Sequence, residues 1–201
     1  MTLDKFSFIL DDVFESEYFK TIQQAAQKST FKTIEDGDKK FYVAFPPQDL
    51  SIKIQEVIEF ICGKKILVVN SCLRMYTEFL STNWGIHADT NVLSSIKPSH
   101  GAVFFLSENK DFINGTALWK HKKYGYALPE MTDNEINKFT NASYNDEDQW
   151  DVSSIIGGVN NRLISYPANY FHSKFPKQAW GSTQENCRLI LAMFYRIETN
   201  N

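Results

Sequence analysis

The chain has 201 residues, 43% of them hydrophobic, and a net charge of −3, which fits one globular domain. The small negative charge gives no electrostatic reason to expect a nucleic acid or an anionic membrane as a partner. Charged residues near the N-terminus interrupt any signal-peptide core, no apolar run is long enough to cross a bilayer, and the three cysteines form no CxxC pair. These features predict a cytoplasmic protein with reduced thiols.

Two helices are predicted before residue 64. The spacing of Asp12 and Glu15 fits a capping box, so the first helix is predicted to begin at Asp12. An apolar stripe follows it, formed by Phe14, Tyr18, Ile22 and Ala25. A second apolar stripe predicts a helix over Asp49–Cys62, with Gly63 as its C-terminal stop. Both stripes are interpreted as core surfaces without a functional role.

After Gly63 the sequence becomes rich in β-branched and aromatic residues, and these runs alternate with Gly, Pro, Asn and Ser. This pattern indicates a β-sandwich or barrel. The predicted strands are Ile66–Val69, Cys72–Leu80, Val92–Ile96, Ala102–Leu106, Thr116–Lys120, Asn161–Tyr166, Tyr170–Phe175 and Arg188–Ile197. A capping-box pair, Thr132 and Glu135, predicts one short helix between them. We therefore predict one domain of mainly β (α+β) class, with helical support in residues 1–63 and a sandwich over residues 64–201.

Three residues form a candidate metal-ligand set. In a strand or tight turn, His87 and Asp89 lie on the same side because side chains alternate. His172 follows a turn far downstream, at the start of a predicted strand, and a closed sandwich can bring it to the other two. Two imidazoles and one carboxylate suit Fe(II) and leave coordination positions open.

Arg188 opens the last predicted strand, on a face that is otherwise apolar. Burying a guanidinium there is costly unless it has a fixed anionic partner. The planar fork of Arg matches a carboxylate, so a dicarboxylate co-substrate would satisfy it. His100 and His121 have no ligand partner at a useful spacing and are interpreted as satisfied core or surface residues. His121, among three lysines, is placed in a solvated basic patch.

With these residues in place, the chain resembles the non-haem Fe(II)- and 2-oxoglutarate-dependent oxygenases that have a double-stranded β-helix (jelly-roll) core. It is most similar to the prolyl-hydroxylase-like branch, from about residue 64 to the end. The resemblance is carried by the His87–Asp89 motif and by the segments Gly101–Leu106, Asn114–Trp119, Asn161–Tyr166, Phe171–Ser173 and Arg188–Phe194.

The resemblance implies a site and an activity. His87, Asp89 and His172 would hold Fe(II), and Arg188 would bind the distal carboxylate of 2-oxoglutarate. Tyr76 matches a residue that often lines the co-substrate pocket, and Arg74, two residues earlier, is expected to face the same cavity. With dioxygen, such an enzyme would hydroxylate a C–H bond of a substrate that the sequence leaves open: a peptidyl side chain, an amino acid or a small metabolite.

Two departures from the family pattern bear on this prediction. A Tyr hydroxyl that often assists the Arg falls near Phe105 here, so Thr90, Ser173 or another donor must replace it. The interval from His172 to Arg188 is also longer than usual, and the extra residues are expected to form a loop beside the site. Two alternatives remain: a cupin-like metal enzyme that does not use 2-oxoglutarate, and a non-catalytic jelly-roll binding module.

Overall fold

The structure, a computed structural model, describes residues 6–36, 39–79, 85–91, 96–107, 114–132, 134–135, 139, 146–178 and 181–198. The elements in chain order are β1 (Phe8–Leu10), α1 (Ser16–Gln27), β2 (Lys32–Asp36), β3 (Lys39–Ala44), α2 (Gln48–Cys62), β4 (Ile66–Tyr76), η2 (Asp89–Asn91), β5 (His100–Phe105), β6 (Gly115–His121), η3 (Glu147–Gln149), β7 (Trp150–Ile156), β8 (Leu163–Pro167), β9 (His172–Phe175) and β10 (Arg188–Ile197).

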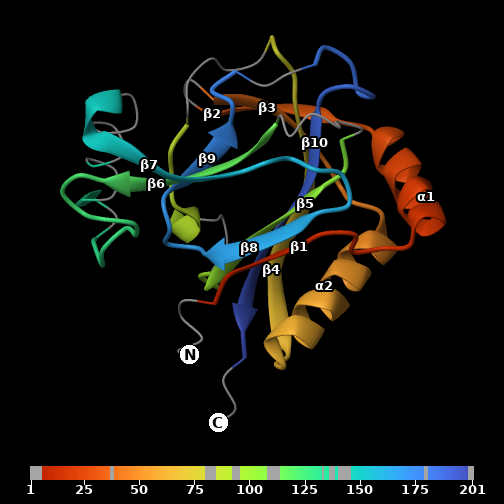
Figure 1. The fold of residues 1–201 in the computed structure, drawn as a ribbon, viewed down its shortest axis with the longest axis horizontal. Coiled ribbons are helices and arrows are strands. Elements are labelled where there is room, and N and C mark those ends of the chain that lie inside the picture. Colours follow the sequence, from red (N-terminus) through yellow and green to blue (C-terminus); the bar gives the residue numbers. More distant parts are fainter. Residues whose placement is uncertain are drawn as a thin grey trace.

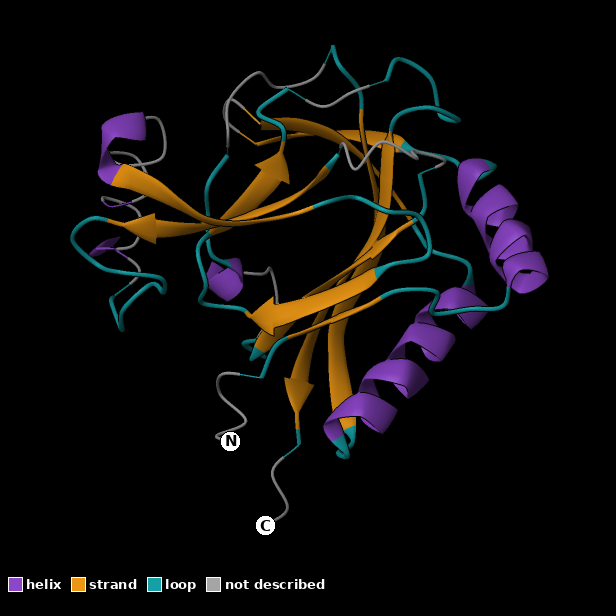
Figure 2. Ribbon diagram, viewed as in Figure 1, coloured by secondary structure: helices purple, strands orange, loops and turns teal. Residues whose placement is uncertain are grey.

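The strands form two antiparallel sheets (Figures 1 and 2). The larger sheet has the order β1-β8-β5-β10-β4-β3-β2, and the smaller has the order β7-β6-β9. Most neighbours in the larger sheet are far apart in the chain, as β10 is from both β5 and β4. This arrangement confirms the predicted jelly-roll fold of mainly β class.

The two helices cover the outer face of the larger sheet, and the side chains of β10 alternate between two cores (Figure 1). Leu189, Leu191 and Met193 face the helices, whereas Ile190 and Phe194 face the space between the sheets. On the helix side, α2 contributes fully buried apolar residues, Leu50, Ile54 and Ile58. Each such side chain stabilises the fold by about 1.5–3 kcal/mol relative to its exposed state. The helices therefore support the sheet and leave its inner face for the pocket.

The first helix begins at Ser16, so the predicted start at Asp12 is wrong. Asp12 has a positive φ of 51°, outside the helical region. The next two backbone N–H groups donate to Asn161: Val13 to its carbonyl and Phe14 to its side chain, both at 3.1 Å. This tertiary contact holds the backbone after Asp12 outside the helix, so the helix begins only at Ser16. The second helix is confirmed, and Gly63 ends it in the left-handed conformation at φ 65°.

Several strands differ from the predicted ones. β4 is one strand where the sequence suggested two, because β10 pairs with it along its whole length. β7 was not predicted, since most of its residues are exposed and show no apolar alternation. β1, β2 and β3 precede residue 64 and join the larger sheet, so this segment is not only helical as expected. Four residues of the predicted strand Val92–Ile96 lie outside the described residues.

The remaining local predictions concern the third helix, the cysteines and the membrane. Thr132 and Glu135 do form the reciprocal hydrogen bonds of a capping box. The N–H of Thr132 donates to Glu135 Oε2 at 2.9 Å, and the N–H of Glu135 donates to Thr132 Oγ1 at 3.4 Å. Cys62, Cys72 and Cys187 are free thiols. Among the residues that the structure describes, no helix is both long and apolar enough to span a bilayer.

Candidate metal centre

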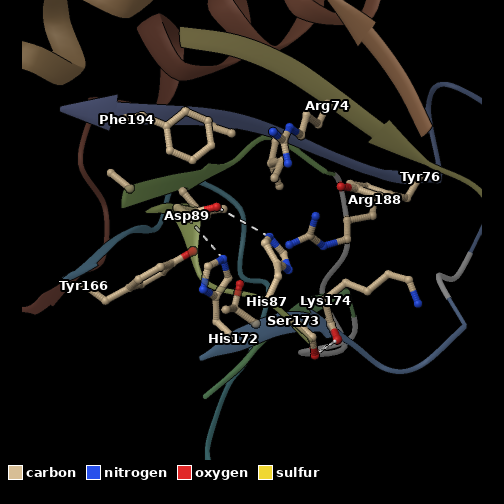
Figure 3. A pocket seen from close by; sticks show the side chains of 15 residues that line it. Arg74, Tyr76, His87, Asp89, Tyr166, His172, Ser173, Lys174, Arg188 and Phe194 are labelled. Atoms are coloured by element: carbon tan, nitrogen blue, oxygen red, sulfur yellow. Dashed lines mark hydrogen bonds and ion pairs between the residues drawn. The ribbon is translucent and has the colours of Figure 1, made fainter. Parts of the chain in front are cut away.

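His87, Asp89 and His172 come together as predicted. Their candidate ligand atoms all lie within 4.8 Å of one another. The two carboxylate oxygens of Asp89 each face one ring: Oδ1 lies 3.5 Å from His87 Nε2, and Oδ2 lies 3.2 Å from His172 Nε2 (Figure 3). Three ligand atoms converging from two distant chain segments are the arrangement that a facial metal site requires.

Backbone pairing between the two segments positions these side chains. The N–H of His87 donates to the carbonyl of His172, and the reverse bond has the same length of 2.9 Å. The N–H of Asp89 then donates to Ala168 at 2.7 Å. Because His87 and Asp89 are two residues apart, both point from this short ladder toward His172. Main-chain hydrogen bonds therefore hold the two segments together at the ligand set.

The orientation of each imidazole is set by its other nitrogen. His87 Nδ1 lies 2.6 Å from the Gly85 carbonyl, and His172 Nδ1 lies 2.9 Å from the Tyr170 carbonyl. A carbonyl only accepts, so each Nδ1 carries the hydrogen and donates it. In the neutral rings, both Nε2 lone pairs then face the Asp89 carboxylate. Acceptors that face one another need a cation between them, and imidazoles held in this way are typical metal ligands.

The charge on Asp89 fits the same conclusion. Burial alone would raise the pKa of this carboxyl, but in the metal-free site His172 and His87, when protonated at Nε2, attract and donate to the carboxylate and hold its pKa well below its usual range. Asp89 is only 8% exposed and is ionised. An ionised buried carboxylate requires a close positive partner, which a divalent metal supplies. The residues present therefore fit a metal ion such as Fe(II).

A pocket opens beside the three ligands, between the two sheets (Figure 3). It is lined by Arg74, Tyr76, His87, Asp89, Ala102, Val103, Thr116, Tyr166, His172, Ser173, Lys174, Arg188, Ile190, Ala192 and Phe194. The strands β4, β5 and β10 supply one wall, and β6 and β9 supply the opposite wall. The metal ligands thus face a partly open pocket of mixed polarity.

Arg188 lies in this pocket and is 4% exposed. Its guanidinium donates from Nε to the Asn114 carbonyl at 3.0 Å and from Nη2 to the Gly115 carbonyl at 3.3 Å. The ring of Tyr76 lies 5.2 Å from its Cζ atom. Burial lowers the pKa of Arg188, which reflects the cost of keeping this charge away from water. In the part of the chain that the structure describes, no carboxylate forms an ion pair with Arg188.

Comparison with known proteins gives a structural likeness only. No protein-family model matches the sequence, and no curated protein matches it. The carbocyclase SnoK, described as non-haem and alpha-ketoglutarate dependent, has a TM-score of 0.65 at 11% identity, over 97% of this chain and 80% of its own. The epimerase SnoN, in complex with Fe3+ and alpha-ketoglutarate, has a TM-score of 0.59 at 11% identity, over 96% and 79%. The collagen prolyl hydroxylase of Paramecium Bursaria Chlorella virus-1, in a 2-oxoglutarate complex, has a TM-score of 0.52 at 10% identity, over 97% of both chains.

The chain has the fold of the 2-oxoglutarate-dependent oxygenases. At these identities the likeness concerns the fold, and the chemistry must be argued from the site. Within this oxygenase fold, Tyr76 and Arg74 line the pocket on β4, as the sequence suggested. Thr90 follows Asp89 in η2 and is not among the lining residues. Its assignment to the co-substrate stays a prediction.

Ser173, the other hydroxyl considered as a substitute for the missing Tyr, is already engaged. Its Oγ accepts from Trp119 Nε1 at 2.9 Å and donates to the Lys174 carbonyl at 2.8 Å. Thr116 is the better placed donor, because its Oγ1 lies in the pocket wall, is buried and has no hydrogen-bond partner among the described residues. In the sequence, Thr116 is only the first residue of the predicted strand Thr116–Lys120 and a member of the family-like segment Asn114–Trp119.

Two further lining residues were not singled out from the sequence. The ring of Tyr166 lies 4.7 Å from the ring of His172, and burial raises the pKa of this phenol well above its usual value, so it stays protonated. Burial, with repulsion from Arg188 and Lys177, lowers the pKa of Lys174 to about 8. Both positions are ordinary strand residues in the sequence, and only the pairing of the strands brings them into the pocket.

The interpretation of His121 as a solvated basic residue is wrong. Its side chain is 3% exposed and lies among aromatic rings, with Trp150 at 4.6 Å and Phe139 at 5.2 Å between centroids. Its Nδ1 accepts the backbone N–H groups of Lys123 at 3.0 Å and Tyr124 at 3.3 Å. The flanking lysines suggested solvent, but the β6 register turns this side chain inward. His121 is a core histidine and not part of the metal centre.

Proposed function

We propose that the protein is an Fe(II)- and 2-oxoglutarate-dependent dioxygenase that hydroxylates a C–H bond. The observation that supports this proposal is that the His-Asp-His ligand set and a buried Arg188 line the same pocket. Arg188 forms no ion pair with a described residue. The similar structures include a carbocyclase, an epimerase and a prolyl hydroxylase, so the fold alone does not choose the reaction. Hydroxylation is the outcome that we propose for this chain.

In the proposed mechanism, bound iron supplies the activation of dioxygen and the oxidative decarboxylation of 2-oxoglutarate. His87, Asp89 and His172 would hold the iron, and the pocket that they line would receive the co-substrate. Arg188 binds the distal carboxylate of 2-oxoglutarate, supported by Tyr76, which fixes the orientation of the co-substrate.

The other pocket residues shape the environment of the reaction. The free hydroxyl of Thr116 donates to the same carboxylate, in place of the Tyr hydroxyl that Phe105 lacks. Ile190, Ala192 and Phe194 exclude water from the wall opposite the ligands. Tyr166 stays neutral beside His172 and adds no second negative charge.

The test is binding and turnover of 2-oxoglutarate by protein loaded anaerobically with iron. We expect His172→Ala to abolish iron binding. We expect Arg188→Gln to leave iron binding unchanged. The same variant is expected to weaken the binding of 2-oxoglutarate by about 2–5 kcal/mol, or at least ~30-fold in Kd. His121→Phe and Arg196→Met are the matched controls, because His121 lies outside the pocket and Arg196 is an exposed residue of the same strand β10.

The same measurements separate the alternatives. A cupin-like enzyme would bind iron with the same ligands and be indifferent to 2-oxoglutarate and to Arg188→Gln. A non-catalytic binding module would keep its fold without binding iron. Either result would replace the proposed function.

A further inference from the structure

Tyr166 carries a buried hydroxyl that the proposed mechanism does not use. The side chain is 3% exposed and lines the pocket, yet its hydroxyl forms no hydrogen bond with any residue that the structure describes. A buried tyrosine hydroxyl usually has a partner. Tyr195, on the helix side of the larger sheet, shows the ordinary case, because its hydroxyl lies 2.8 Å from Ser165 Oγ. The Tyr166 hydroxyl is therefore available to a group at the metal centre.

Strand pairing places Tyr166 beside the ligand Asp89. Tyr166 of β8 lies opposite Gly101 of β5, and its ring centroid is 4.7 Å from that of His172. A methyl group built on Gly101 would lie 2.9 Å from Asp89 Oδ2 and 3.8 Å from Tyr166 Cζ, the carbon that bears the hydroxyl. The carboxylate oxygen and the phenol thus share the space over Gly101. Figure 3 shows the hydroxyl pointing toward Asp89 and His172.

Asp89 needs a hydrogen-bond donor once a metal is bound. Each of the three ligand residues offers one ligand atom, so one of the two Asp89 oxygens is left over. Within the described part of the chain, the side-chain nitrogens at ion-pair distance from Asp89 are His87 Nε2 and His172 Nε2. Both would bind the metal and would then have no hydrogen to donate. A ligating carboxylate is normally hydrogen-bonded in turn, and a buried oxygen without a donor is costly.

We propose that Tyr166 is a positioning residue whose hydroxyl donates a hydrogen bond to Asp89 Oδ2 and leaves Oδ1 to bind the metal. The proposal rests on the proposed function, since it requires the metal that this function uses. A phenol is protonated and uncharged at neutral pH, so it orients the carboxylate without competing for its charge. Arg74 also interacts electrostatically with Asp89, but it forms no ion pair with it. Tyr166 is the hydroxyl donor on the Oδ2 side, which is also the side of His172.

The experiment compares two tyrosine-to-phenylalanine variants of the full chain, each of which deletes one buried hydroxyl. Tyr166→Phe is expected to weaken the binding of Ni(II) about tenfold in Kd, measured by calorimetric titration, because the second oxygen of Asp89 loses its donor. The Tm of metal-free Tyr166→Phe is expected to equal or exceed that of wild type, since this hydroxyl has no hydrogen bond with a described residue to lose.

Tyr195→Phe is the matched control, because it removes the same atom from a side chain outside the pocket. It loses the hydrogen bond to Ser165, so its metal-free Tm is expected to fall by about 2–4 °C. Its Kd for Ni(II) is expected to stay unchanged. The two variants should therefore show opposite patterns of stability and metal affinity.

Co(II) supplies a second readout that a purely structural role of Tyr166 would not move. The visible absorption of Co(II) depends on the number and arrangement of its ligand atoms. Without the Tyr166 hydroxyl, Asp89 Oδ2 is free to join Oδ1 on the metal, so the Co(II) spectrum of Tyr166→Phe is expected to differ from that of wild type. Tyr195→Phe is expected to give the wild-type spectrum.

Two results would overturn the proposal. An unchanged Ni(II) affinity in Tyr166→Phe would show that Asp89 does not depend on the hydroxyl, and a tenfold loss of 2-oxoglutarate in the same variant would assign the hydroxyl to the co-substrate. Equal losses of Ni(II) affinity in Tyr166→Phe and Tyr195→Phe would mean a general structural effect. Wild type that binds neither Ni(II) nor Co(II) would instead refute the proposed function itself, before any variant is compared.

Discussion

Asp89 is packed against a glycine, and this contact decides how the carboxylate is held. A methyl group built on Gly101 would lie 2.9 Å from Asp89 Oδ2 and 3.4 Å from the Tyr166 ring. We expect Gly101→Ala to push the carboxylate out of line with the two imidazoles and to weaken metal affinity by about tenfold, the lower end of the effect of disturbing the support of a metal ligand. Calorimetric titration with Ni(II) measures it.

The control for this variant is Gly63→Ala. The added methyl group meets nothing within 4 Å there, but Gly63 has φ +65° at the end of α2. This change is expected to lower the free energy of unfolding by about 1 kcal/mol, because of backbone strain, while metal affinity stays unchanged. Equal metal affinity in wild type and Gly101→Ala would show that the carboxylate adjusts freely, contrary to our expectation.

The metal ligands were predictable from the sequence, and the pocket hydroxyl of Thr116 was not. His87 and Asp89 are linked by a local rule, since two residues of separation place them on one side, and His172 completes a chemically specific set. Thr116 reaches the pocket because β6 pairs with β9 so that Thr116 lies opposite Lys174. Such a register depends on non-local hydrogen bonds and cannot be inferred from the segment alone.

At the scale of the element, the burial of His121 in β6 predicts a pH dependence of stability. Burial among aromatic rings, with repulsion from Lys123, lowers the pKa of His121 in the folded state. Below about pH 6.5 the unfolded chain binds a proton at this position that the folded chain resists. Stability is therefore lost as the pH falls below that value, by at most about 1.4 kcal/mol per unit from this residue.

We expect His121→Phe to flatten the fall in unfolding free energy between about pH 7 and pH 5, measured by urea denaturation of the metal-free protein. The variant also loses the acceptor for the N–H groups of Lys123 and Tyr124, so its stability at pH 8 is expected to be lower by about 1–3 kcal/mol. The slope distinguishes titration from this structural loss. Parallel curves for both proteins would mean that His121 is not the group responsible.

The elements themselves differ in how far local sequence determines them. α2 was predicted because one apolar face and a terminal glycine suffice to specify it. The start of α1 depends on Asn161, which lies far away in the chain, and β7 is held by pairing with β6 rather than by burial. Local rules therefore predict amphipathic helices and buried strands, and miss elements that exist because a partner strand or loop is present.

At the scale of the whole molecule, the metal centre joins parts that are distant in the chain. His87 and Asp89 come from the segment before η2 and from η2 itself, and His172 begins β9 in the smaller sheet. The unfolded chain cannot assemble these three ligands, so a metal that binds them stabilises only the folded state. The stabilisation depends on the free metal concentration relative to Kd.

We therefore expect Ni(II) at about a thousand times its Kd to add about 4 kcal/mol of stability, which raises the Tm by roughly 8–16 °C for a chain of this size. A chelator is expected to reverse the shift. His172→Ala should remove the metal-dependent rise in Tm, because only two of the three ligands remain. His121→Phe should retain this rise, even from a lower starting Tm. Scanning calorimetry of the apo and loaded proteins measures both. Identical Tm values with and without metal would mean that the three side chains lie close together without binding an ion, and the proposed chemistry at this pocket would have no basis.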